Sequence, residues 1–142
     1  MNKQLHEFYG PLYVATRAGK IAYLSYLNKL GKTAVFPKGY EPTQEALDDW
    51  FIWLKNVFMP LNEIMERVIL ERSHLIIEET MPECLLNYVT HVVGYRAILA
   101  KWEKGDFSER QSLIDFPKEL DEYVELRYAD LKGKQAKLLG KL

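Results

Sequence analysis

The chain has 142 residues, a formal net charge of −1 and a hydrophobic content of 48%. This length and composition suit a globular protein, and we expect a single helical domain over residues 1–142. The near-neutral charge gives no indication of a nucleic acid or an anionic membrane as a partner. The lone cysteine, Cys84, excludes an internal disulfide. Since no run of about 18 apolar residues occurs, we expect no membrane span and a cytoplasmic location.

The first predicted helix runs from about Leu5 to Leu30. Its apolar residues return at three- and four-residue spacing, which is typical of an amphipathic helix. Gly10-Pro11 near its start predicts a first turn or a kink, because proline lacks the backbone donor. Gly31 is expected to end the helix in the left-handed conformation. Residues 32–42 contain two prolines and a glycine, and we expect a loop there.

A second helix is predicted from about Gln44 to Phe58, with Thr43 as its N-cap. Pro60 then either kinks a continuous helix or starts a new one, and we favour a kink or a very tight turn. A central pair of helices follows, at about 60–80 and 82–104, each opened by a Met-Pro pair. The apolar stripe of the second of them consists of Leu85, Leu86, Val89, Val92, Val93 and Leu99.

A polar connection from Gly105 to Phe116 leads to the last predicted helix, which is rich in lysine toward its end. The connections between the predicted helices are short enough to favour antiparallel neighbours. The predicted fold is therefore all-α, an antiparallel bundle of four to five helices around the central pair.

Three arginines fall in the middle of the apolar stripes of three different predicted helices, namely Arg72, Arg96 and Arg127. A buried charge without a partner is very costly, so each arginine requires a partner. One interpretation is a set of ion pairs between helices. The glutamates expected to pair with them are Glu79, Glu103 and Glu7.

The alternative interpretation is a pocket for a carboxylate or a phosphate, because guanidinium groups bind these anions in a fork. Tyrosines on the neighbouring stripes, Tyr88, Tyr95, Tyr123 and Tyr128, would line such a pocket. The ligand-binding residues of this alternative are Arg72, Arg96, Arg127, Glu79, Tyr95 and Tyr128.

Metal binding is the weaker alternative. Glu71 and His74 have the Glu-x-x-His spacing of di-iron bundles, but the chain has no second motif of this kind. We therefore attribute the match to chance and expect no metal site and no cofactor. Cys84 and His91 lie two turns apart on one predicted helix, about 10 Å, which is too far for a nucleophilic pair. No complete catalytic constellation occurs in the sequence.

Apolar residues outside the main stripes predict an oligomer. Leu70 and Ile77 lie off the stripe of the first central helix, and Tyr88, Tyr95 and Trp102 share one flank of the second. We expect a homodimer through these flanks, or a protein partner bound by them. The leading hypothesis is thus a non-enzymatic helical module that oligomerises or binds a protein. Its rivals are a small-molecule binder or enzyme with an arginine-held anion, and a metal-dependent bundle.

Several segments together resemble a recurring pattern: FYGPL (8–12), MPLNE (59–63), HVVGYRAIL (91–99), WEKGDF (102–107) and FP (116–117). The pattern is similar to that of an uncharacterised family of small all-helical bacterial proteins, of the kind carried on mobile gene cassettes. The resemblance spans most of the chain. It implies a bacterial, single-domain helical protein, and it implies no activity and no catalytic residue.

Overall fold

Two long helices form one layer of the structure, and each contains a π-helical turn. In the computed structural model, which describes residues 2–140, the first consists of α1 (Asn2–Gln4), η1 (Leu5–Tyr9) and α2 (Gly10–Leu30). The second consists of α3 (Gln44–Trp53), η2 (Leu54–Phe58) and α4 (Met59–Arg72), and it is followed by the 3₁₀ turn η3 (Ser73–Leu75). The other layer consists of α5 (Glu83–Glu103) and α6 (Glu119–Leu138).

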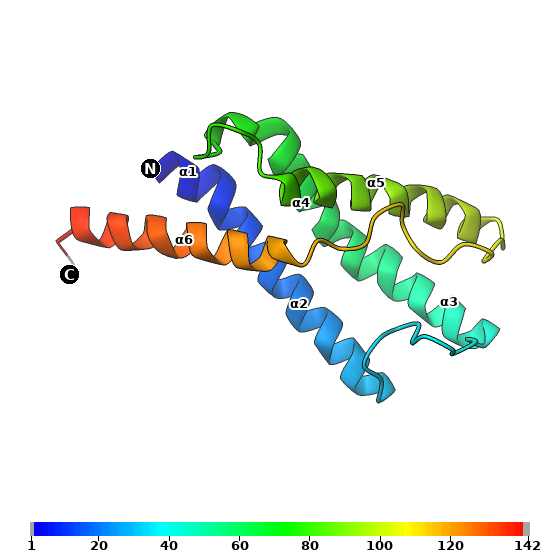
Figure 1. The fold of residues 1–142 in the computed structure, drawn as a ribbon. Helices are drawn as coiled ribbons and strands as arrows, with labels where there is room; N and C mark the ends of the chain where they lie inside the picture. Colours follow the sequence, from blue (N-terminus) through cyan, green and yellow to red (C-terminus); the bar gives the residue numbers. More distant parts are fainter. Residues whose placement is uncertain (1, 141–142) are drawn as a thin grey trace.

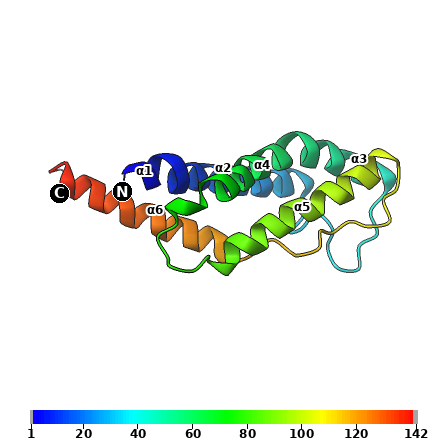
Figure 2. The same ribbon diagram turned by 90° about the horizontal axis from the view of Figure 1, so that it is seen from above.

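The two long helices run antiparallel and diverge toward the loop of residues 31–43, which joins α2 to α3 (Figure 1). Figure 2 shows the second layer lying below them, with α5 along the α3–α4 helix and α6 along the first long helix. The helices α5 and α6 begin near each other and then run in opposite directions. The predicted all-α bundle is confirmed, since residues 2–140 contain helices and loops but no strand.

The local signals for helix ends are confirmed at the 31–43 loop. Gly31 ends α2 with φ 68°, a left-handed conformation that glycine adopts without steric cost. Thr43 caps α3, because its hydroxyl oxygen accepts the backbone N–H of Ala46 at 3.1 Å. Both features depend on neighbouring residues alone, which is why sequence reasoning finds them.

Both π-helical turns lie directly before an interior proline. In the second long helix the Met59 N–H donates to the carbonyl of Leu54, five residues back, and Pro60 follows. The same arrangement precedes Pro11 in the first long helix. In a regular α-helix the proline ring clashes with a carbonyl of the preceding turn, and the wider π turn relieves this clash. The predicted kink or turn at Pro60 is therefore a π turn within one continuous helix.

The first helix of the central pair is predicted at about 60–80. Its predicted end is wrong, because α4 stops at Arg72. Side chains of the first long helix form hydrogen bonds with the backbone groups of the segment after α4. The Tyr9 hydroxyl oxygen accepts the N–H of Ile77 at 3.1 Å, and the Gln4 side chain donates to the carbonyl of Leu75 at 3.1 Å. These bonds replace those that further helical turns would make. The second predicted helix, at about 82–104, agrees with α5 to within one residue at each end.

Aromatic side chains fill much of the core between the layers. The largest fully buried side chains are Trp102, Tyr9, Tyr88, Phe8, Leu12, Leu85, Leu120, Val92 and Val124. The prediction of Tyr88 and Trp102 on an outer flank is wrong, since they are 0% and 2% exposed, whereas Leu86 of the predicted stripe is 52% exposed. The loop of residues 104–118 packs on α5 and covers this flank. Two faces of α5 are therefore buried, whereas the prediction of a single apolar stripe implies one buried face.

Candidate functional site

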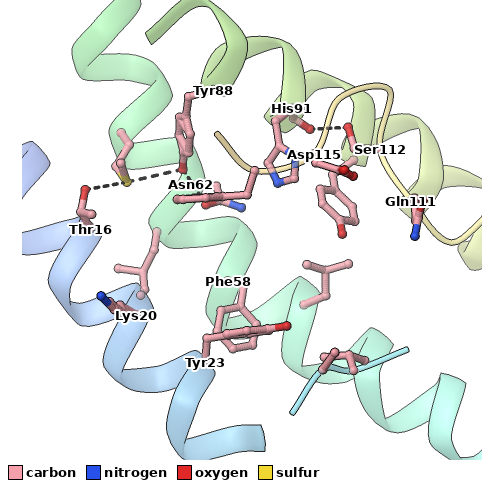
Figure 3. A pocket seen from close by; sticks show the side chains of 18 of the residues that line it. Thr16, Lys20, Tyr23, Phe58, Asn62, Tyr88, His91, Gln111, Ser112 and Asp115 are labelled. Atoms are coloured by element: carbon pink, nitrogen blue, oxygen red, sulfur yellow. Dashed lines mark hydrogen bonds between the residues drawn. The ribbon is translucent and has the colours of Figure 1, made fainter. Parts of the chain in front are cut away.

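A cavity of about 530 Å³, partly open to solvent, lies between the helices (Figure 3). Side chains of α2, the α3–α4 helix, α5 and the start of α6 line it, together with parts of both long loops. Its apolar lining includes Val35, Trp50, Leu54, Phe58, Leu61 and Phe116. Polar side chains lie mainly on the wall formed by α5 and the 104–118 loop. The cavity therefore combines an aromatic and aliphatic surface with a few hydrogen-bonding groups.

His91 is a buried titratable side chain of this wall. It is 8% exposed, and its Nδ1 lies 2.6 Å from the carbonyl oxygen of Ile114 in the loop. A carbonyl oxygen only accepts, so Nδ1 carries the proton. Burial lowers the pKa of His91, which keeps the ring neutral at pH 7. In this tautomer Nε2 is an acceptor, and no residue of the described chain forms a hydrogen bond with it.

Two tyrosine hydroxyls share the cavity with His91. The Tyr95 ring meets the His91 ring edge-on, with centroids 4.9 Å apart, and burial raises the pKa of Tyr95 to about 12. Tyr23 reaches the same space from α2, and its hydroxyl points toward the open centre of the cavity (Figure 3). Burial also raises the pKa of Tyr23, so both hydroxyls keep their protons at neutral pH.

The loop of residues 104–118 forms the roof over this part of the cavity. Ser112 Oγ donates to the carbonyl oxygen of His91 at 2.6 Å, and the indole N–H of Trp102 donates to the carbonyl oxygen of Glu109 at 2.8 Å. At Gly94 an added Cβ would overlap Ser112 Oγ and lie 2.9 Å from Leu113 N. The absence of a side chain at Gly94 thus lets the loop lie directly on α5.

The end of the cavity near α6 has mostly satisfied polar groups. Tyr88 donates its hydroxyl proton to Asn62 Oδ1 at 2.6 Å, and Thr16 donates to the sulfur of Met65 at 3.7 Å. Asp121 differs, because its buried Oδ1 has no hydrogen-bond partner among residues 2–140. Burial raises the pKa of Asp121, which is half-buried. Asp121 is therefore a second acceptor at the border of the cavity.

The three mid-stripe arginines do not meet at this cavity. Arg72 lies 2.8 Å from Glu7, Arg127 Nε donates to Glu78 at 2.6 Å, and Arg96 binds both carboxylate oxygens of Glu66. Arg72 lines a separate, shallower cavity of about 270 Å³ on the first and second long helices. Each guanidinium is thus half of a distinct ion pair, with side chains 39–44% exposed.

Of the expected partners, Glu7 pairs with Arg72, as predicted. Glu79 is exposed, and Glu103 pairs with Lys55 at 2.7 Å. The prediction for Glu79 is wrong because it assumes that the helix continues to this residue, whereas the helix ends at Arg72. In the extended segment that follows, the neighbouring Glu78 turns toward α6 instead.

The predicted tyrosines also separate. Tyr95 lines the large cavity, whereas Tyr128 stacks on Tyr13 with ring centroids 4.1 Å apart. Tyr123 donates to Glu78 at 2.5 Å and bonds to the Tyr9 hydroxyl at 3.2 Å. The candidate site therefore keeps two of the four predicted lining tyrosines, Tyr88 and Tyr95, and Tyr95 alone of the six predicted ligand-binding residues. It adds His91, which the sequence singles out only for a nucleophile role. The hydrogen bond between His91 and Ile114 could not be predicted from the spacing of residues in the sequence.

Metal and nucleophile chemistry gain no support from the described residues. Within residues 2–140, no group of three or more histidine, cysteine, aspartate or glutamate side chains is placed to share a metal ion. Glu71 and His74 are both exposed. Burial raises the pKa of the Cys84 thiol, which disfavours the thiolate. None of the helices in this part of the chain is long and apolar enough to cross a membrane.

Comparison with family models, curated proteins and solved structures finds no match to this chain. The bacterial family that the sequence resembles therefore stays a prediction. The functional conclusion rests on the geometry of the large cavity.

Proposed function

We propose that the protein binds a small, largely apolar organic molecule in the cavity roofed by the 104–118 loop. The observation that carries the proposal is the cavity itself, about 530 Å³ with aromatic walls. Ligand sites typically have volumes of about 300–1,000 Å³ and combine apolar linings with a few placed polar groups. The cavity opens to solvent beside the exposed Lys20, Gln111 and Asp115, so a ligand can enter it.

The ion pairs argue against the anionic ligand that the arginine pattern suggested. Arg72, Arg96 and Arg127 already have carboxylate partners, and none of them is among the side chains that line the large cavity. Arg110 lines the cavity, and one of its terminal nitrogens lies 2.9 Å from Glu41, while its buried Nε has no partner among residues 2–140. An anion would have to compete with these carboxylates. A neutral, apolar ligand needs no such displacement.

Filling the cavity tests the proposal. An ideal Cβ at Gly19 lies 3.9 Å from Leu61 Cδ1, and both residues line the cavity. The variant Gly19→Leu should therefore occupy part of the space. Gly133→Leu is the matched control, because Gly133 is an exposed helical glycine with no atom near its Cβ position. Both substitutions replace a helical glycine and should raise helix propensity alike.

Fluorescence titration with the probe 2-methoxynaphthalene measures binding to the three proteins. We expect saturable binding to the original protein with a Kd on the order of 10–100 μM, given the ligand efficiency of molecules of this size. Gly133→Leu should bind equally well, and Gly19→Leu at least about tenfold more weakly. Equal binding by Gly19→Leu would place the probe elsewhere and refute the proposal.

Self-association through the outer helix faces is the second candidate. Leu70, predicted outside the core, is 62% exposed, and Ile77 is 43% exposed. Exposed apolar side chains on neighbouring segments favour a contact between two copies of the chain. Size-exclusion chromatography with light scattering tests this, with Leu70→Lys as the variant. A monomer at high concentration for the original protein would rule out the dimer.

A further inference from the structure

We infer that the ligand is a neutral molecule carrying a hydroxyl group, a phenol or a ring alcohol, which donates its hydrogen bond to His91 Nε2. This inference rests on the proposed function of the cavity and specifies the ligand class. It follows from three features of the wall formed by α5 and the 104–118 loop.

The first feature is the fixed tautomer of His91. The Ile114 carbonyl at 2.6 Å holds the proton on Nδ1. Ser112 Oγ, at 2.6 Å from the His91 carbonyl oxygen, and the close approach at Gly94 hold that loop in place. Because the loop determines which nitrogen is protonated, Nε2 presents a lone pair and cannot donate while the ring is neutral. A ligand group at Nε2 must therefore be a donor.

The second feature is the surroundings of His91. Tyr95 lies edge-on to the His91 ring, and the Phe116 ring lies perpendicular to it with centroids 5.8 Å apart. Tyr23 adds a hydroxyl group from α2, close enough to Tyr95 to contribute to its raised pKa. A ligand hydroxyl both donates and accepts, which suits a site with one pure acceptor and two tyrosine hydroxyls. The ring that carries it would lie against the aromatic walls.

The third feature is the distribution of charge. The sheltered part of the cavity holds neutral groups, His91, Tyr95 and Tyr23, whereas Asp115 and Lys20 are exposed at its border. Moving a charged ligand into the sheltered part would carry a desolvation cost without an opposite charge to offset it. Two carboxylates of the lining would instead favour an ammonium ligand, namely the exposed Asp115 and the half-buried Asp121, whose Oδ1 has no partner among residues 2–140. A cationic probe separates these two possibilities.

A pair of probes that differ only at the hydroxyl tests the inference. Binding of 2-naphthol and 2-methoxynaphthalene is measured by fluorescence at pH 7.5, with 2-naphthylmethylammonium as the cationic probe. We expect 2-naphthol to bind about fivefold more tightly than its methyl ether, the gain from one net hydrogen bond. The ammonium probe should bind more weakly than either. Equal binding of naphthol and ether, or tightest binding of the ammonium, would overturn the inference.

The variant His91→Asn isolates the acceptor. The asparagine amide N–H can occupy the position of Nδ1–H and donate to Ile114, while nothing replaces Nε2. The naphthol-to-ether preference should fall to about one. The NMR signal of the Trp102 indole N–H, which bonds to Glu109 in the loop, reports whether the loop stays in place.

The original protein supplies a second test that does not depend on the folding of a variant. Acid protonates Nε2 and turns it into a donor, so the preference for naphthol over ether should disappear at low pH. The groups facing His91 are Asp115 from the loop and Tyr88 and Tyr95 from α5. The tyrosines stay neutral throughout this range. A preference that persists at a pH where the NMR signals of the His91 ring show it to be protonated would contradict the inference. If neither naphthol nor its ether binds at any pH, the proposed function itself fails.

Discussion

Gly94 of α5 packs directly against Ser112 of the 104–118 loop, with no room between them for a methyl group. The contact places the loop on the helix, and it lies one turn from His91, whose carbonyl oxygen accepts the Ser112 hydroxyl. The position of the roof and the tautomer of His91 therefore share one structural cause.

Substituting Gly94 by alanine should displace the loop. We expect the free energy of unfolding to fall by about 1–3 kcal/mol, the usual cost of overpacking a tight contact. Gly133→Ala, at an exposed helical position with open space around it, should instead raise it by up to about 1 kcal/mol. Urea denaturation followed by circular dichroism measures both. Similar gains for the two variants would mean that the loop does not press on Gly94.

The ion pair of Arg127 can be tested with two adjacent glutamates. Glu78 accepts from Arg127 and from Tyr123, while Glu79 is exposed. Glu78→Gln should lower the free energy of unfolding by about 1–2 kcal/mol, because two hydrogen bonds to a charged group are weakened at a partly exposed site. Glu79→Gln should change it by less than about 0.5 kcal/mol. The reverse order would restore Glu79 as the partner predicted from the sequence.

The pair of Glu66 and Arg96 should show strong coupling. Glu66 is 6% exposed, so removing Arg96 leaves a buried carboxylate without its partner. Arg96→Met should cost about 2 kcal/mol of unfolding free energy, and adding Glu66→Gln to it should recover part of this loss. A double-mutant cycle by chemical denaturation measures the coupling. Additive effects of the two substitutions would show that the pair contributes nothing.

Stability should also depend on pH through His91. Burial holds the pKa of His91 in the folded protein below its ordinary value of 6.5. The unfolded chain therefore binds a proton before the folded chain does, and the free energy of unfolding should decrease as pH falls below about 6.5. His91→Asn should show a shallower decrease over the same interval. Matching pH profiles for the two proteins would assign the dependence to other groups.

Sequence reasoning succeeds here where a feature depends on nearby residues. The caps at Gly31 and Thr43 and the extent of α5 are of this kind. It fails where a structural feature depends on a residue far away in the sequence. The end of α4 depends on Tyr9, which lies 68 positions from Ile77 in the sequence.

The candidate site is of the second kind. Its lining comes from α2, the α3–α4 helix, α5, α6 and both loops, so no local motif marks it. The arginines are a partial success, since each has a carboxylate partner, but their side chains are 39–44% exposed rather than buried in a core. Two of the three partners could not be predicted from the positions of residues around each helix, because these partners depend on how the helices pack.

The π-helical turn of the second long helix places a constraint on chain length. Trp50 and Ile69 are nineteen positions apart, and in an uninterrupted α-helix they would point about 100° away from each other. Both are nevertheless buried in one core, because the π turn absorbs about one residue of rotation between them. Deleting one residue from Leu54–Phe58 would restore a regular helix in which Trp50 and Ile69, then eighteen positions apart, still share one face. Homologous chains should therefore tolerate the loss of this one residue but not a change of any other length in the segment.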